Sequence, residues 1–164
     1  MKKRMSTGEM THIDTFGRLK MVDVSEKART WREARAEAFV SLSKETLRRI
    51  CSGDVPKGNV LEAARLAGIM AAKKTWELIP LCHQLQLTGV EVDFCPDELK
   101  GEIRICSSVK TNDRTGVEME ALVAATIAAL TIYDMCKAID REITLHDARL
   151  TFKAGGKSGV YSRG

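Results

Sequence analysis

Three charged residues in the sequence could move protons or hold a phosphate group. Lys57 lies in the loop 54–58, beside Gly58 and directly before the N-terminus of a predicted helix. Helix N-termini attract anions through their free N–H groups and the helix macrodipole, so a phosphate could approach Lys57 there. Asp134 and Lys137 lie three residues apart on one face of a second predicted helix. A partly desolvated carboxylate and amine can have the shifted pKa values that general acid–base catalysis requires.

Each of these features also has an ordinary structural explanation. Lys57 could be a solvated loop lysine. Asp134 and Lys137 could form an i, i+3 ion pair that adds little to the stability of the helix. The residues alone therefore leave both explanations open.

The segment after Pro80 and the start of the second helix hold further candidates. His83 stands at a predicted helix-to-strand junction, where side chains often point into a cleft. A lone histidine is more often structural or exposed, and adjacent Cys82 and His83 project differently, so we do not expect them to share a metal. Glu118 and Glu120 open the second helix, where acidic residues normally satisfy the helix dipole.

The C-terminal segment 153–159 superficially resembles a phosphate-binding P-loop. Thr151 stands where that pattern needs its first glycine, and no helical sequence follows Ser158. A basic glycine-rich loop that closes on an anionic ligand and a disordered terminus both fit the segment. We expect residues 1–10 and 154–164 to be flexible.

Two helices must position these residues. The first begins after Asn59, with Glu62 three residues later as in a capping box, and is expected to run until Pro80. The second extends from about Val117 to Ile139, and its many alanines would let it pack close to a neighbour.

Alternating apolar residues predict the strands. The segment 85–94 fits a strand with a bulge at Gly89, and it forms a hairpin with the segment 102–110. A further strand is expected over 143–152. The segment 32–40 fits a helix by composition and a strand by alternation. If it is a strand, the order is βαββαβ, the ferredoxin-like plan.

The composition is that of one soluble globular domain spanning 1–164. Hydrophobic residues make up 44% and charged residues 29% of the chain, which excludes a disordered chain and a membrane protein. The longest charge-free run, 121–133, is shorter than the roughly 20 residues that cross a bilayer, so it predicts a buried helix. The net charge of +4 has both signs interleaved, which is not the balance of a DNA-binding protein.

The five cysteines include no C-x-x-C pair and no zinc-site spacing. Reduced thiols and an N-terminus without the pattern of a signal peptide predict a cytoplasmic protein without a membrane partner.

Eight short segments carry a combination of motifs that is hard to produce by chance. They are Met21–Ser25, Arg32–Ala36, Lys57–Gly58, Ala67–Ile69, Leu78–His83, Gly116–Leu122, Leu130–Ala138 and Gly155–Gly159, and the match around them covers the chain from about Thr11 to Gly159. Together they resemble the cyclic pyranopterin monophosphate synthase family, the molybdenum cofactor biosynthesis protein C.

The resemblance implies a fold, an assembly and a reaction. The fold is α+β, ferredoxin-like βαββαβ, with an antiparallel sheet and helices packed on one face, and it makes 32–40 a strand. The assembly is a homohexamer built as a trimer of dimers, with the active site at a dimer interface. The reaction is the conversion of 3′,8-cyclo-7,8-dihydroguanosine 5′-triphosphate to cyclic pyranopterin monophosphate with release of diphosphate, by a phosphorus–oxygen lyase.

The resemblance also implies roles for particular residues. Asp134 and Lys137 would move protons in the ring rearrangement, and Lys57 would aid proton transfer or steady phosphate charge. Arg32 and Lys153 would supply positive charge for the triphosphate. The remaining substrate contacts are expected from Leu81, Cys82, His83, Glu118, Met119 and Glu120.

Two positions depart from the family pattern. Gln84 stands where proline is usual and could loosen the turn at His83, because Gln does not fix its own φ. Asn59 stands where aspartate is common and keeps a good N-cap. Neither departure removes a proposed catalytic group.

Two other functions compete with this interpretation. A non-catalytic nucleotide-binding regulatory oligomer would explain the basic segments but gives no role to Asp134 and Lys137. An RNA-binding ferredoxin-like module needs exposed aromatic residues on the sheet, and the hairpin strands offer only Phe94. We expect no nucleic acid partner. No metal-ligand cluster is visible, so the sequence leaves open whether Mg²⁺ accompanies the triphosphate.

Overall fold

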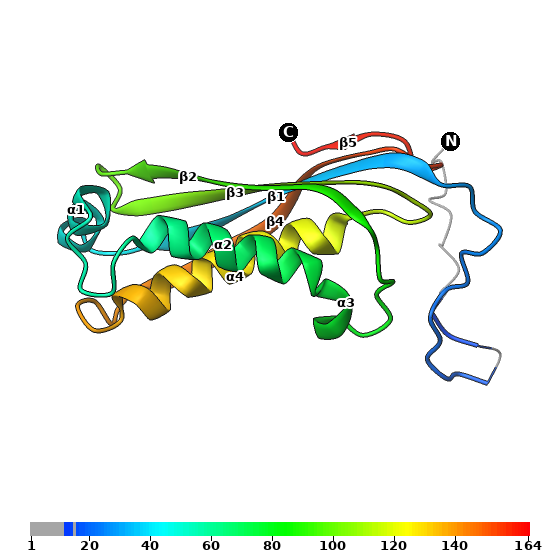
Figure 1. Ribbon diagram of the computed structural model, residues 1–164, viewed down its shortest axis with the longest axis horizontal. Coiled ribbons are helices and arrows are strands. Elements are labelled where there is room, and N and C mark those ends of the chain that lie inside the picture. Colours follow the sequence, from blue (N-terminus) through cyan, green and yellow to red (C-terminus); the bar gives the residue numbers. More distant parts are fainter. Residues whose placement is uncertain (1–11, 15) are drawn as a thin grey trace, which may run out of the picture.

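The predicted sheet forms, and helices cover one of its faces (Figure 1). The computed structural model describes residues 12–14 and 16–164, and the expectation for residues 1–10 lies outside them. In chain order the elements are β1 (Thr30–Ser41), α1 (Lys44–Ser52), α2 (Val60–Lys73), α3 (Thr75–Leu78), β2 (Leu87–Asp97), β3 (Glu102–Asp113), α4 (Glu118–Cys136), β4 (Thr144–Ala154) and β5 (Tyr161–Ser162).

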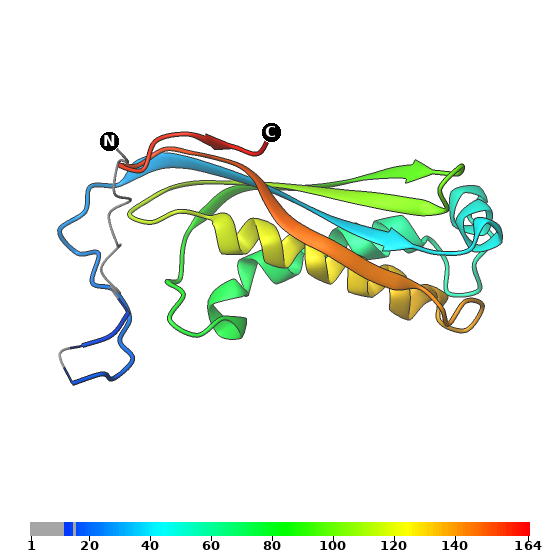
Figure 2. The ribbon, with the colours of Figure 1, turned by 180° about the vertical axis from the view of Figure 1, so that it is seen from behind.

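The strands follow the ferredoxin-like plan. The sheet order is β2-β3-β1-β4-β5, and every neighbouring pair is antiparallel. Figures 1 and 2 place α2 and α4 on the same face of this sheet. The predicted α+β class, with its βαββαβ order and one-sided helix layer, is confirmed.

The ambiguous segment 32–40 lies within β1 and is a strand. Ala34, Ala36 and Ala38 are buried, whereas Arg35 is exposed, as alternation along a strand requires. The buried side chains are small because α4 packs directly over β1. The alternation therefore outweighed the helix-forming composition.

The hairpin and its bulge are also confirmed. Leu87 pairs with Thr111 and Gly89 pairs with Lys110, so β2 accommodates one extra residue between two pairs. A bulge of this kind bends a strand and increases its local twist.

The C-terminal segment contributes a short strand. Tyr161 and Ser162 form β5 and pair with Lys153 and Phe152 of β4. The backbone N–H of Arg163 donates to the Thr151 carbonyl at 2.8 Å. The edge strand β5 therefore comes from the segment 154–164, which we expected to be flexible.

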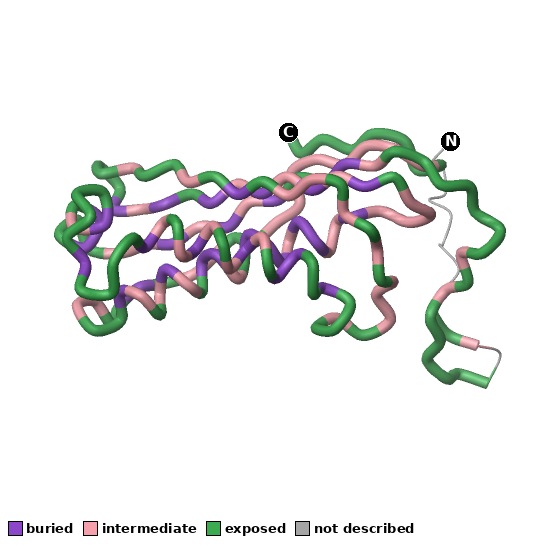
Figure 3. The backbone as a smooth tube through the Cα atoms, in the orientation of Figure 1, coloured by how far each residue is buried: buried purple, intermediate pink, exposed green. Residues whose placement is uncertain are grey.

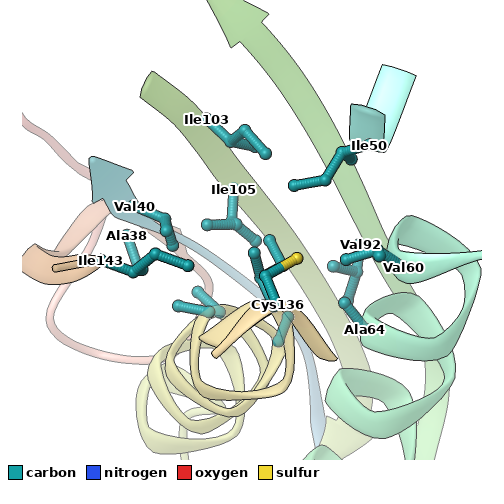
Figure 4. Packing of buried hydrophobic residues seen from close by; sticks show 14 of the residues in the cluster. Ala38, Val40, Ile50, Val60, Ala64, Val92, Ile103, Ile105, Cys136 and Ile143 are labelled. Carbon is teal, nitrogen blue, oxygen red and sulfur yellow. The ribbon is translucent and has the colours of Figure 1, made fainter. Parts of the chain in front are cut away.

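The hydrophobic core lies between the sheet and the helices. Buried residues occupy the facing sides of the two layers in Figure 3, and Figure 4 shows side chains from both layers packed together. α2 and α4 approach very closely at Gly68, where a Cβ atom would lie 2.8 Å from the carbonyl oxygen of Ala124. The alanines predicted to allow close packing serve this contact.

α4 is the central helix of the core. Its length and composition would allow it to cross a membrane. However, Ala125, Ala128 and Ile132 have no exposed surface because the sheet and α2 cover them. We therefore interpret α4 as an internal helix of the fold, as the charge-free run predicted.

The first predicted helix is shorter than expected. α2 ends at Lys73, and Lys74 has the non-helical angles φ −111° and ψ 12° before α3 begins. The Thr75 hydroxyl donates to the carbonyls of Ala71 and Ala72, and so satisfies carbonyl groups that a continuing helix would use. The expected continuous helix up to Pro80 is wrong.

α1 was not predicted at all. Its Ser43 N-cap accepts a hydrogen bond from the Thr46 backbone, and Gly53 ends it in the left-handed conformation. Both signals are present in the sequence, but only Leu47 and Ile50 mark an apolar face, so the periodicity is short.

Candidate active site

Lys57, Asp134 and Lys137 lie in contact near the C-terminal end of α4. Nζ of Lys137 is 2.8 Å from Oδ1 of Asp134, and Nζ of Lys57 is 3.1 Å from Oδ2. Nζ of Lys57 also donates to the backbone carbonyl of Asp134 at 2.8 Å. Two amines therefore hold one carboxylate, and we call these three residues the carboxylate cluster.

Pairing, and not burial, sets the ionisation of this cluster. Hydrogen bonds from Lys137 and then Lys57 hold the pKa of Asp134 below its ordinary value, and Asp134 in turn raises the pKa of Lys137. All three side chains are about half exposed, so the partial desolvation expected from the sequence is absent within this chain. A change in their surroundings is needed before Asp134 can readily take up a proton.

The start of α2 places Lys57 beside α4. Asn59 caps α2 by accepting a hydrogen bond from the Glu62 backbone at 3.1 Å, as predicted, and Gly58 turns the chain with φ +93°. The Glu62 carboxylate bonds to Arg65, so the second half of a capping box is not formed. The amine of Lys57 reaches across to Asp134 instead of lying free at the helix N-terminus.

A cavity of about 480 Å³ lies at the opposite end of α4. Its walls come from the loop before β2, the first turn of α4 and the segment before β1. They include six of the residues predicted to contact the substrate, namely Leu81, Cys82, His83, Glu118, Met119 and Glu120.

The loop before β2 is held in a defined conformation. Leu81 has a φ of 65°, a region that non-glycine residues seldom occupy and that is enriched at functional sites. Nε2 of His83 lies 2.7 Å from the carbonyl oxygen of Val22. Because a carbonyl only accepts, Nε2 carries the proton in this contact, which ties the loop to the segment before β1.

Glu120 is the buried acid of this cavity. Its exposed fraction is 3%, and burial raises its pKa from 4.5 to about 7, with a further contribution from the charge of Glu118. The helix dipole alone does not account for an acid with a raised pKa. Burial also raises the pKa of the adjacent Cys82 thiol.

A second hollow, of about 670 Å³, continues from the first because Lys27 and Thr115 line both. Arg32 lines this hollow and donates to the carbonyl oxygens of Asp113 and Arg114 at 3.0 and 3.1 Å. We call the two connected hollows the groove.

An ion pair holds Lys153 beside Glu118, which lines the first hollow. Its Nζ lies 3.0 Å from Oε1 of Glu118. Each side chain is about one-third exposed, so both remain accessible from the surface.

Three further basic residues line the groove, Lys27, Arg114 and Lys157, and sequence reasoning missed the first two. Nε of Arg114 is buried and has no hydrogen-bond partner among the described residues. Lys157 belongs to the glycine-rich segment that was considered as a loop for an anion. Lys27 and Arg114 belong to no recognisable pattern, and only the fold brings them to Arg32.

The carboxylate cluster and the groove are far apart in one chain. Glu118 and Asp134 lie in the first and last turns of the same helix, 16 residues and therefore about 24 Å apart along its axis. A small ligand seated in the groove cannot touch Asp134 of the same chain. The structure thus separates the predicted site residues into two groups. Lys57, Asp134 and Lys137 form the first. The second contains Arg32, Leu81, Cys82, His83, Glu118, Met119, Glu120 and Lys153.

Comparison with known proteins gives consistent matches over nearly the whole chain. The sequence model of the MoaC family matches residues 21–156. A protein of Pelotomaculum thermopropionicum, named cyclic pyranopterin monophosphate synthase, is 56% identical over 154 residues, which are 94% of this chain and 91% of that protein. A protein of Heliobacterium modesticaldum with the same name is also 56% identical over 154 residues, 94% of this chain and 97% of that protein.

Proposed function

The chain belongs to the MoaC family, and we propose on this basis that it converts 3′,8-cyclo-7,8-dihydroguanosine 5′-triphosphate to cyclic pyranopterin monophosphate with release of diphosphate. The chain is therefore an enzyme of molybdenum cofactor biosynthesis, a lyase. One structural observation supports this activity most: a carboxylate bracketed by two amines occurs in the same fold as a groove with a basic end.

The carboxylate cluster supplies the proton chemistry. The reaction opens the imidazole part of the purine, rebuilds it as a pterin and closes a cyclic phosphate. Asp134 and Lys137 exchange protons with the rearranging ring, and Lys57 aids proton transfer or steadies phosphate charge. The contacts at 2.8 and 3.1 Å lower the pKa of Asp134, and Asp134 raises the pKa of Lys137, so the cluster offers a carboxylate base and an ammonium acid together.

The groove binds the substrate. Cys82, His83, Met119 and Glu120 surround the ring in the first hollow, with Leu81 and Glu118 beside them. Arg32 holds the triphosphate in the second hollow. Lys27, Arg114 and Lys157 add positive charge there, and Lys153 adds charge beside Glu118.

The competing functions explain fewer of these features. A binding-only oligomer needs the groove but leaves the carboxylate cluster without a role. An RNA-binding module is not supported by Phe94, because its ring packs against the core with Arg65 over it.

The site is completed by a second copy of the chain. About 24 Å separates the two groups along α4, so the carboxylate cluster of one copy must act on a substrate held in the groove of another. This arrangement is the dimer-interface site that the family resemblance implies. The homohexamer, as a trimer of such dimers, stays a prediction.

Two further expectations stay predictions. Mg²⁺ is commonly held by substrate phosphates together with one or two carboxylates. Its association with the triphosphate would therefore need few protein ligands, and residues 12–14 and 16–164 contain no group of three or more His, Cys, Asp or Glu side chains placed to hold an ion. A cytoplasmic location agrees with the five cysteines, all of which are free thiols.

Turnover of the native protein and of Asp134→Asn tests the proposed function. The native protein should release diphosphate and form the pterin product from the cyclic dihydroguanosine triphosphate. Asp134→Asn should lose about 100-fold or more in rate and still bind substrate by calorimetry, because the groove is intact. Asp147→Asn is the matched control, since Asp147 is an exposed carboxylate whose φ of 50° asparagine tolerates.

Two outcomes would contradict the proposal. Tight binding without any turnover by the native protein would favour the binding-only oligomer. Undiminished turnover by Asp134→Asn would remove Asp134 from the mechanism.

A further inference from the structure

Two cysteines lie next to each other on the outer face of the β2–β3 hairpin. Cys95 of β2 pairs directly with Arg104 of β3. Cys106 stands two residues further along β3, so the two cysteines are diagonal neighbours across the strands. Ile105 points into the core, and side chains alternate along a strand, so Arg104 and Cys106 point to the opposite face. In the part of the chain that the structure describes, no helix covers that face (Figures 1 and 2).

The two thiols and the guanidinium group of Arg104 are in contact. Nη2 of Arg104 lies 3.8 Å from Sγ of Cys95, within the range of a hydrogen bond to sulfur. A side-chain hydrogen bond also joins Cys106 to Cys95. We call Cys95 and Cys106 the thiol pair. It shares no residue with the carboxylate cluster or with the groove.

The two thiols differ as an attacking thiol and a resolving thiol do. Cys95 is exposed and has a cationic neighbour, and reactive cysteines share these two properties. Cys106 is half-buried. Burial raises the pKa of Cys106, Arg104 opposes this, and the charge and hydrogen bond of Cys95 raise the pKa further. Cys106 therefore keeps its proton while Cys95 reacts.

Cys51 provides a comparison within the same chain. It is exposed like Cys95, but its charged neighbour is the acid Glu98. Burial and then the negative charge of Glu98 raise the pKa of the Cys51 thiol, which disfavours the reactive thiolate. Exposure alone therefore does not make a cysteine of this chain reactive, and the surroundings of Cys95 are a distinct feature.

We propose that Cys95 and Cys106 form a redox modification site, at which a small disulfide of the glutathione class oxidises the two thiols to a disulfide within one chain. The site is independent of the proposed function, because its residues belong to neither half of the proposed active site.

The oxidation proceeds by two thiol–disulfide exchanges. The Cys95 thiolate attacks one sulfur of the small disulfide, and the other sulfur leaves as a thiolate that takes up a proton. Cys106 then loses its proton and attacks the sulfur of Cys95, which expels the second small thiol. Two protein thiols are thus oxidised to one disulfide, and one small disulfide is reduced to two small thiols.

The position of the pair makes this disulfide easy to reverse. Cα atoms of diagonal neighbours are roughly 7–8 Å apart, at the upper limit of what a disulfide spans, so the strands must shift slightly to form the bond. β2 can make this shift because it is an edge strand of the sheet. A strained disulfide is readily reduced, as suits a transient modification in a reducing compartment.

Thiol counts after treatment with oxidised glutathione test the site. The folded native protein is treated, freed of reagent, unfolded and titrated. It should show three free thiols in place of five, a mass lower by two hydrogen atoms and no attached glutathione. Peptide mass spectrometry should locate the bond between Cys95 and Cys106, and dithiothreitol should restore all five thiols.

Three serine variants assign the roles of the cysteines. Cys106→Ser should retain one glutathione on Cys95 as a mixed disulfide, because the resolving thiol is missing. Cys95→Ser should form neither the internal disulfide nor a mixed disulfide on Cys106. Cys51→Ser is the matched control at an exposed cysteine and should form the internal disulfide as the native protein does. Circular dichroism checks that each variant is folded.

Three results would overturn the proposal. The first is five free thiols in the treated native protein. The second is a glutathione that stays on Cys95 of the native protein, since Cys106 would then not resolve it. The third is a disulfide between two chains, seen as a doubled mass on a non-reducing gel, in place of the bond within one chain.

Discussion

Glu120 should make the stability of this protein depend on pH in a way that one substitution removes. Its carboxyl group is 3% exposed in the first turn of α4, and burial raises its pKa from 4.5 to about 7. Glu120→Gln has the same shape and no charge at any pH. The variant therefore isolates the effect of ionising this one group inside the fold.

The magnitude follows from the two pKa values. The folded chain holds the Glu120 proton up to about pH 7, whereas the unfolded chain releases it near pH 4.5. Between these values the folded state binds more protons, so stability falls as the pH rises. The full difference corresponds to about 3 kcal/mol at roughly 1.4 kcal/mol per pH unit. Stability from this group is thus fully present below about pH 4.5 and lost above about pH 7.

Urea unfolding at several pH values between about 5 and 8 measures this effect. The native protein should lose stability relative to Glu120→Gln by up to about 3 kcal/mol across this range, at equal protein concentration. Glu45→Gln, at an exposed position on α1, controls for loss of a negative charge. Parallel stability curves for the native protein and Glu120→Gln would refute the reasoning, because they would mean that Glu120 ionises alike in both states.

Two further predictions concern close contacts. Gly68→Ala should destabilise the protein by about 1–3 kcal/mol in urea unfolding. The added Cβ atom would lie 2.8 Å from the Ala124 carbonyl oxygen and force α2 away from α4. An unchanged midpoint of the urea unfolding curve would contradict this packing. Gly155→Ala should raise KM for the triphosphate substrate about tenfold, a cost of ~1.4 kcal/mol. A Cβ atom at this position, whose φ is +94°, would overlap the Trp31 carbonyl and displace the glycine-rich segment from Arg32. An unchanged KM in steady-state kinetics would contradict this prediction.

The sequence predicted those parts of the fold that a single periodicity defines. α4 and the β2–β3 hairpin follow directly from helical spacing and from alternation. The residues of the segment 32–40 could not decide whether it forms a helix or a strand. Alanine favours a helix, but it is also suitable in a strand over which a helix packs closely, as α4 does over β1. The break at Lys74 could not be predicted either, since it depends on a hydroxyl of Thr75 that turns back on the preceding carbonyls.

The sequence also suggested candidate site residues but not how they are arranged. Asp134 and Lys137 are neighbours in a helix, so their contact follows from spacing, whereas Lys57 joins them only because α2 starts beside the last turn of α4. The basic lining from Lys27 and Arg114 depends on which loops meet at one end of the sheet. No local pattern contains that information.

The position of the site residues along α4 carries a functional consequence of its own. A helix of 19 residues is rigid on the scale of a nucleotide, so it holds its two ends about 27 Å apart. The carboxylate cluster at one end and the groove at the other therefore cannot contact one small ligand within a single chain. In the proposed function, a second copy of the chain brings its groove to the carboxylate cluster of the first, and a two-fold axis would repeat that contact. The rigidity that separates the two groups in one copy would then also fix their distance across the pair, so the proposed function predicts that activity depends on assembly.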